Sequence, residues 1–86
     1  MYHLRLDRKA QKDMDRLRRD LWSRVRDAIL SLRDDPKPQG SLKLHGVVDA
    51  YRLKVGDYRI VYEVDDASQV VTIRRVKHRS EVYRGL

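Results

Sequence analysis

A stretch of alternating apolar and polar residues around one glycine constrains the fold more than any other part of this chain. It runs from Ala50 to Val64 and reads AYRLKVGDYRIVYEV. Period-two alternation on both sides of Gly56-Asp57 predicts two antiparallel strands joined by a two-residue hairpin loop. Glycine at the first loop position suits a type II′ turn. The loop then sets the register, which pairs Val55 with Tyr58, Lys54 with Arg59, Leu53 with Ile60, Arg52 with Val61, and Tyr51 with Tyr62.

The two faces of this hairpin differ in chemistry. One face is aliphatic and aromatic, and we expect it to join a core. The other face places Lys54 directly opposite Arg59, with Arg52 one pair further along. Like charges at opposed cross-strand positions are destabilising, so we interpret this face as a binding surface for an anionic partner. The alternative is a solvated strand face on which Lys and Arg protect against edge pairing.

The N-terminal half predicts one strand and two helices. Residues 2 to 6 alternate as a short strand, and Asp7 is a plausible N-cap for the helix that follows. A single helix over residues 8 to 33 would be about 39 Å long, whereas a compact chain of this size has a diameter of about 30 Å. We therefore expect a helical hairpin that breaks near Arg19-Asp20, with Asp20 or Ser23 capping the second helix. A coiled-coil dimer of about three heptads is the rival interpretation. Its apolar stripe comprises Ala10, Met14, Leu17, Leu21, Val25, Ala28 and Leu32.

The remaining segments complete an α+β fold. Prolines and a glycine mark residues 34 to 40 as a loop. Strands are expected near 50–56 and 58–65, and the β-branched run 70–76 predicts a third adjacent strand. The order is an N-terminal strand, a helical hairpin and then a three-stranded antiparallel meander. We expect one domain over residues 1–86, with a mainly antiparallel sheet and the helices on one face.

Charge and composition narrow the class of partner. Twenty Lys and Arg stand against thirteen Asp and Glu, giving a net charge of +7, which favours a polyanion such as nucleic acid or an acidic protein. Cysteine is absent, and the histidines lack the spacing of metal ligands. No cofactor motif is present. Because no segment has signal-peptide or transmembrane character, we expect a cytoplasmic protein without membrane contacts.

The segment that follows the last predicted strand carries further candidate chemistry. It reads KHRSEVYR from Lys77 to Arg84. His78 is a group suited to proton transfer near neutral pH. Tyr83 could stack on a base, as aromatic side chains do in RNA recognition. Taken singly, either residue is better explained by surface packing, but their proximity to the basic hairpin favours a shared site.

These segments resemble the RelE toxins of bacterial and archaeal toxin–antitoxin systems. The resemblance rests on KLHG at 43–46, on YRLKVGDYRIVYEV at 51–64 and on VKHRSEVY at 76–83, and it covers essentially the whole chain. It implies a metal-independent endoribonuclease that cleaves mRNA in the ribosomal A site by 2′-hydroxyl attack. It also implies a RelB-like antitoxin that binds the toxin and blocks it, besides the ribosome and mRNA as partners.

The resemblance assigns roles residue by residue. Lys54 and Arg59 match basic residues of the family's active face, and Tyr83 matches its terminal tyrosine. Arg52 stands where family members carry a lysine as the presumed base, and arginine stays protonated. Lys54 or His78 is then the expected base, with His78 preferred. Arg79 is chosen over Lys77 as the match to the family's arginine, and the expected RNA contacts are Arg52, Arg75 and Lys77.

Two other functions fit the same resemblance. A non-catalytic toxin of the related ParE type, which inhibits DNA gyrase, would share the fold. Lys54, Arg59 and Tyr83 together argue against that function. A degenerate member that only binds its antitoxin is the third hypothesis, and the arginine at position 52 is the feature that favours it.

Overall fold

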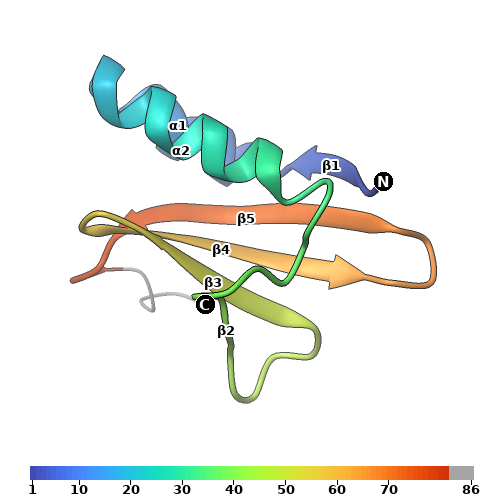
Figure 1. The fold of residues 1–86 in the computed structure, drawn as a ribbon. Coiled ribbons are helices and arrows are strands. Elements are labelled where there is room, and N and C mark those ends of the chain that lie inside the picture. Colours follow the sequence, from blue (N-terminus) through green and yellow to red (C-terminus); the bar gives the residue numbers. More distant parts are fainter. Residues whose placement is uncertain (82–86) are drawn as a thin grey trace.

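The computed structural model describes residues 1–81, which form two helices and one five-stranded sheet (Figure 1). The sheet order is β1-β5-β4-β3-β2, and only the β1–β5 pairing is parallel. The predicted α+β architecture is confirmed. In chain order the elements are β1 (His3–Leu6), α1 (Arg8–Asp15), α2 (Arg19–Ser31), β2 (Leu42–Lys43), β3 (Ala50–Val55), β4 (Tyr58–Asp65) and β5 (Val70–His78).

The β3–β4 hairpin has the register that its sequence predicts. Lys54 lies opposite Arg59, Arg52 opposite Val61, and Val55 opposite Tyr58. Gly56 has a φ of 58°, whereas Asp57 is outside the left-handed region, a combination that a type II′ turn requires and a type I′ turn does not allow. The turn is therefore built on glycine because its first position demands a positive φ.

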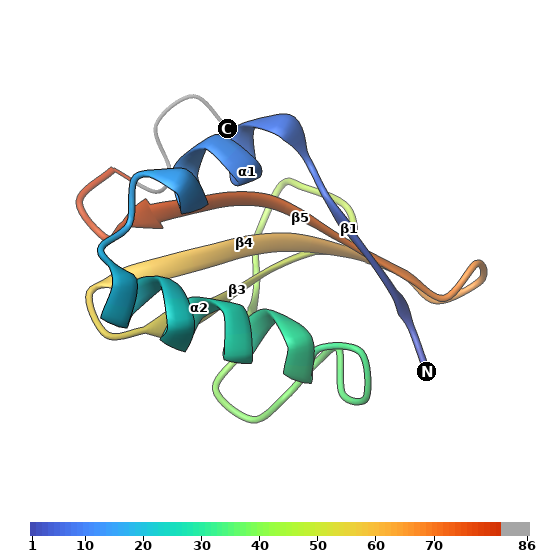
Figure 2. The same cartoon turned by 90° about the horizontal axis from the view of Figure 1, so that it is seen from above.

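Both helices cover the same face of the sheet. In the view from above, α1 lies over the β5 side and α2 over the β3 side (Figure 2). Three residues of β4 and three of β5 are buried in this layer, with Val25 and Ile29 of α2 and the following residue Leu32 in the same core cluster. The residues that alternate with them belong to the second face, which is turned away from the helices. The strand residues of this core cluster are Ile60, Tyr62, Val64, Val71, Ile73 and Val76.

The helical hairpin is confirmed, but its capping differs from the prediction. The chain leaves the helical conformation at residues 16–18, and α2 begins at Arg19, so Arg18 occupies the N-cap position. Asp20 lies within the first turn, where its charge favours the helix dipole without capping it. The predicted cap at Asp20 or Ser23 is therefore wrong. Asp7 does stand at the N-cap of α1, but its side chain caps no backbone N–H and pairs with Arg74 at 2.6 Å.

Tyr62 is the largest side chain buried in the core. It is fully buried, its ring stacks on Tyr51 with 5.9 Å between centroids, and its hydroxyl donates to the Pro36 carbonyl at 2.9 Å. Burial raises the pKa of Tyr62 to about 12 because it penalises the phenolate. The hydroxyl thus fixes the 34–40 loop over the core only while it keeps its proton.

Tyr62→Phe is expected to lower the free energy of unfolding by about 1 kcal/mol at pH 7, the usual worth of one neutral hydrogen bond. Because the folded pKa of Tyr62 lies above its unfolded value near 10, its contribution is present below pH 10 and is lost as pH rises through 12. Urea unfolding of both proteins between pH 7 and 11.5 should show their stabilities converging above pH 10. Parallel curves over that range would contradict this role.

Candidate nucleic-acid interface

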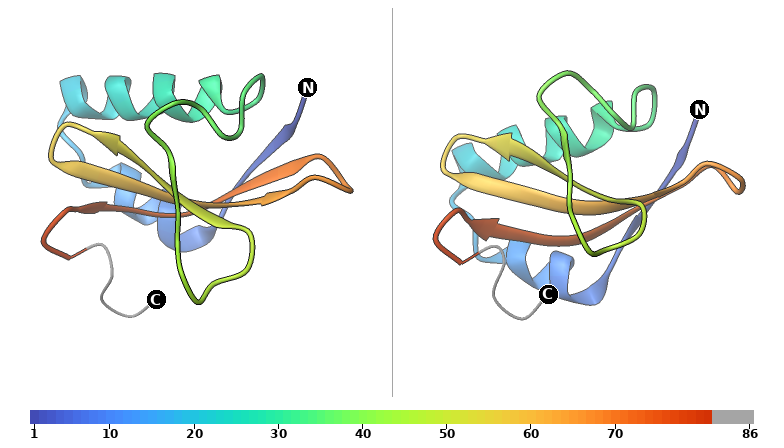
Figure 3. Two further views of the ribbon diagram at one scale, coloured as in Figure 1. Left: turned by 60° about the horizontal axis from the view of Figure 1, so that its bottom comes forward. Right: turned by 90° about the horizontal axis from the view of Figure 1, so that it is seen from below.

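Three cations form a row across three strands on the second face. Lys54 lies opposite Arg59 in the β3–β4 ladder, and Arg59 lies opposite Lys77 in the β4–β5 ladder. Directly opposed residues of antiparallel strands share a face, so the three side chains leave the sheet on the same side. We call Lys54, Arg59 and Lys77 the cation row. Figure 3 (right) views this second face, with the helices behind the sheet.

The charge of the cation row is only partly balanced within the molecule. Among residues 1–81, no carboxylate lies within 4 Å of a charged nitrogen of Lys54, Arg59 or Arg52. Arg52 extends the charge toward β2, in the neighbouring register position opposite Val61. Like charges held in adjacent strands repel one another, so an anion bound on this face would relieve a repulsion that the fold maintains.

The turn carbonyls orient the guanidinium of Arg59. Its Nη1 donates to the carbonyl of Gly56 at 3.1 Å and to that of Tyr58 at 3.0 Å. The Nε and Nη2 edge carries the three other N–H donors, for which no hydrogen bond to residues 1–81 is present. That edge is the fork with which arginine binds a phosphate or carboxylate through two parallel bonds. Arg59 therefore presents its fork in a fixed orientation.

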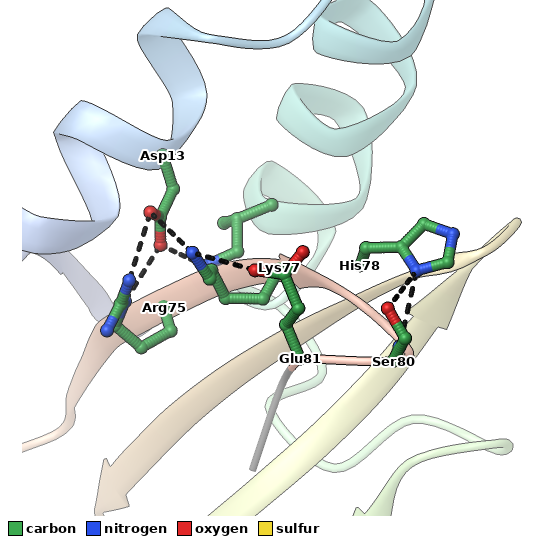
Figure 4. A network of polar contacts seen from close by, with 7 residues as sticks. Asp13, Arg75, Lys77, His78, Ser80 and Glu81 are labelled. Atoms are coloured by element: carbon green, nitrogen blue, oxygen red, sulfur yellow. Dashed lines mark hydrogen bonds and ion pairs between the residues drawn. The ribbon is translucent and has the colours of Figure 1, made fainter. Parts of the chain in front are cut away.

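Lys77 is the acid-flanked member of the cation row. Its Nζ lies 4.0 Å from Oδ1 of Asp13 and 3.7 Å from Oε2 of Glu81 (Figure 4). Only 23% of its side chain is exposed. The two carboxylates therefore flank the Lys77 amino group at the end of β5.

Asp13 of α1 completes the edge of β5. β1 pairs with β5 only at Val70–Ile73, so the rest of β5 has no strand on that side. The Asp13 carboxylate lies along this free part of β5. Its Oδ2 accepts hydrogen bonds from the backbone N–H of Val76 and from Nε–H of Arg75, both at 2.9 Å. Its Oδ1 accepts a hydrogen bond from Nη2–H of Arg75 at 3.2 Å. It is the one buried charged side chain among residues 1–81. The network therefore stabilises the strand end that carries Lys77.

The charge state of Asp13 follows from these partners. Burial alone would raise the pKa of its carboxyl. The hydrogen bonds from Arg75 and Val76, together with the positive charges of Arg75 and Lys77, outweigh burial and hold the pKa of Asp13 below its ordinary value. Asp13 also engages the guanidinium of Arg75, a residue expected to contact RNA.

The other predicted site residues lie at the end of β5. His78 is paired with Tyr58, so it leaves the strand on the side opposite to the cation row, and its ring meets the Tyr58 ring edge-on at 5.5 Å. Its Nδ1 lies 2.9 Å from the Ser80 hydroxyl (Figure 4). Arg79 returns to the hairpin, where its N–H donates to the Asp57 carbonyl at 2.7 Å. Tyr83 lies outside the described residues.

Residues 1–81 contain neither a cluster of metal ligands nor a membrane-spanning helix. Across residues 1–81 no three His, Asp or Glu side chains gather as metal ligands. Neither α1 nor α2 has the length and apolar character needed to cross a membrane.

The fold is that of a small RelE-like toxin. It superposes on the archaeal RelE–RelB complex from Pyrococcus horikoshii OT3 with a TM-score of 0.82, at 27% identity, covering 93% of this chain and 97% of that one. Residues 4–83 match the family described as the ParE toxin of the type II toxin–antitoxin system parDE, and the chain belongs to this RelE/ParE group of toxins.

Two relatives are similar to this chain over nearly their whole length. The mRNA interferase toxin RelE of Escherichia coli K12 is 31% identical over 86 residues, covering 95% of this chain and 90% of that protein. Toxin RelG of Mycobacterium tuberculosis H37Rv is 31% identical over 84 residues, covering 96% of this chain and 97% of that protein. The predicted resemblance to RelE toxins is thereby confirmed.

Proposed function

We propose that this toxin is an endoribonuclease that cleaves mRNA on the ribosome and is held inactive by a RelB-like antitoxin. The observation that carries the proposal is the cation row, in which three strands present Lys54, Arg59 and Lys77 on one face. The similarity to an mRNA interferase of E. coli supports the same activity.

The proposed chemistry is attack of a ribose 2′-hydroxyl on the adjacent phosphodiester. The new bond joins the 2′-oxygen to phosphorus, and the bond to the 5′-oxygen breaks. The reaction needs positive charge at the crowded phosphate, a base for the hydroxyl proton and an acid for the leaving oxygen. Arg59 would bind the phosphate through its Nε–Nη2 edge, and Lys77 would neutralise charge as it develops.

The cation row bears on which residues would move protons. Lys54 stands within the row, and a lysine, unlike an arginine, can serve as a general base. Arg52 cannot serve as the base because a guanidinium stays protonated. His78 leaves β5 on the opposite side, so it would act only on RNA that passes around the strand end. We therefore propose Lys54 as the base and Lys77, on the same face as Arg59, as the acid for the leaving oxygen.

The remaining site residues have proposed supporting roles. Lys77 takes the place first considered for Arg79, because it is Lys77 that lies opposite Arg59. Arg79 and Arg52 would contact neighbouring phosphates. Tyr83 would stack on a base of the bound message.

The proposed antitoxin would cover the cation row. Relatives of this fold have been solved with such a partner, including the RelE–RelB complex of P. horikoshii. An acidic or amphipathic segment laid over Lys54, Arg59 and Lys77 would satisfy their charges. Cleavage would then be blocked by occupation of the phosphate site.

The second candidate is inhibition of DNA gyrase. It is favoured by one observation, the match over residues 4–83 to a family named for ParE. This activity would not need Arg59 to bind a scissile phosphate. A supercoiling assay with purified protein tests it directly.

The decisive experiment is to express the chain without an antitoxin and to map the 5′ ends of a translated reporter mRNA. We expect cuts within codons that depend on translation and disappear with Arg59→Ala. Growth arrest with intact message would overturn the nuclease proposal in favour of gyrase. Folded protein that causes neither cuts nor arrest would leave only antitoxin binding.

A further inference from the structure

Three guanidiniums converge on the two-residue β3–β4 turn from three different elements. Arg59 of β4 donates to the Gly56 carbonyl. Arg79, just after β5, places its Nε 3.9 Å from the Asp57 carboxylate. Arg24 of α2 completes the set, with Nη2 only 3.4 Å from the point where a Cβ on Gly56 would stand. The turn, the start of α2 and the end of β5 lie at the same end of the molecule (Figures 1 and 2).

Little in the described part of the chain balances this charge. Arg24 is exposed, and no carboxylate of residues 1–81 pairs with it or with Arg59. The Arg79–Asp57 contact is long and lies between side chains that are 65% and 73% exposed, so it contributes little. Gly56 also has no side chain to separate Arg24 from the turn. The turn thus presents a second concentration of positive charge beside the cation row.

We propose that Arg24, Arg59 and Arg79 form a second phosphate site, which binds the RNA backbone phosphate adjacent to the one held by the cation row. This inference rests on the proposed nuclease function. Gly56 lies two residues beyond Lys54, or about 7 Å along the strand, so the two sites are adjacent without coinciding. Arg59 is shared by the two sites, because its Nε–Nη2 edge is left for the phosphate of the cation row while its guanidinium, held on the turn carbonyls, adds its charge to the second site.

A nucleic acid strand fits this pair of sites better than a single small anion. Consecutive phosphodiesters supply charges at regular intervals, and forked guanidiniums bind phosphate oxygens through paired hydrogen bonds. α2 would thereby contribute to RNA binding as well as to the core. Arg24 is the residue that this inference adds to the interface.

The test measures binding without cleavage. Wild-type and variant proteins are titrated against a fluorescent 2′-O-methyl RNA oligonucleotide, whose blocked 2′-oxygen prevents the proposed attack. Fluorescence anisotropy at several low salt concentrations gives both Kd and its salt dependence. The matched control is Arg26→Ala on the same helix, because Arg26 is paired with Asp27 at 3.0 Å and lies over the Trp22 ring.

We expect Arg24→Ala to raise Kd about tenfold, as loss of a charge-assisted hydrogen bond should, and to reduce the slope of log K against log salt by about 0.7. Arg26→Ala should stay within about twofold of wild type. Arg24→Lys should restore the salt slope while recovering only part of the affinity, since it keeps the charge and loses the fork. Thermal unfolding of each variant verifies that it is folded.

Several outcomes would overturn the inference. Equal Kd and slope for Arg24→Ala and Arg26→Ala would remove Arg24 from the site, as would wild-type protein that binds no RNA even at low salt. A loss of affinity for poly-glutamate without a loss for RNA would assign the turn to a protein carboxylate. Since binding is read without cleavage, a failed nuclease assay and a failed Arg24 site remain distinguishable.

Discussion

Replacing Asp13 by alanine is expected to lower the free energy of unfolding by about 3–5 kcal/mol, the usual cost of removing one partner from a buried ion pair. The variant would leave the Arg75 guanidinium without its carboxylate and the Val76 N–H without an acceptor at an edge that no strand covers. Urea unfolding at pH 7 measures the change.

Two variants separate the contributions of Asp13. Asp13→Asn keeps an oxygen that can accept the Val76 N–H but loses the charge, so we expect an intermediate loss. Asp15→Ala on the same helix removes an exposed carboxylate that accepts only from Gln11, and it should change stability by no more than about 0.5 kcal/mol. If Asp13→Ala were as mild as Asp15→Ala, the network would have no structural role.

The same network predicts a dependence on pH. Because the pKa of Asp13 is lowered in the folded state, its contribution is present above the unfolded value near 4 and is lost as pH falls through the folded value. Wild type should therefore lose stability below pH 4 more steeply than Asp13→Ala does. Identical acid profiles for the two proteins would argue against a charged Asp13 in the fold.

Arg59→Ala is expected to slow mRNA cleavage on programmed ribosomes by about 10²- to 10³-fold, the cost of removing one preorganised donor from a developing oxyanion. Single-turnover rates at saturating toxin isolate the chemical step from binding. Arg59→Lys should recover little of the rate, because a lysine cannot both bond the two turn carbonyls and present a fork.

The control for this prediction is Arg5→Ala. Arg5 is exposed on β1. It is paired with Thr72 and therefore lies outside the cation row. Its loss should leave the rate within about twofold of wild type, as expected for a single exposed charge outside the site. Equal rates for Arg59→Ala and Arg5→Ala would remove Arg59 from the reaction.

The hairpin and the layer order could be predicted from the sequence because they depend on local patterns. The alternation around Gly56 determined the β3–β4 register residue by residue. The length of the N-terminal apolar stripe required two helices, and these are α1 and α2. Such features follow from periodicity and turn chemistry alone.

The β5 register could not be predicted from a regular alternation. Ile73 and Val76 are both core residues, although residues three apart lie on opposite faces of a regular strand. A β-bulge solves the conflict: Tyr62 pairs with Ile73 and Val61 with Arg75, which leaves Arg74 without an opposite residue. The extra residue is what turns Lys77 toward Arg59.

The bulge also explains how far the candidate site could be predicted. Lys54 opposite Arg59 followed from the hairpin, and Lys77 joined them only through the shifted register of β5. The spacing of two apolar residues at 73 and 76 was the available signal. Asp13 had no such signal, because its role depends on where β1 ends beside β5.

The pairing of β1 with β5 has a consequence for the order in which the sheet can form during synthesis. Residues 3–6 are synthesised well before their partners at 70–73. Pairing across such a sequence separation is slow because a long loop must close first. β5 also lies between β1 and β4, so β1 can join the antiparallel strands only after β5 has been synthesised.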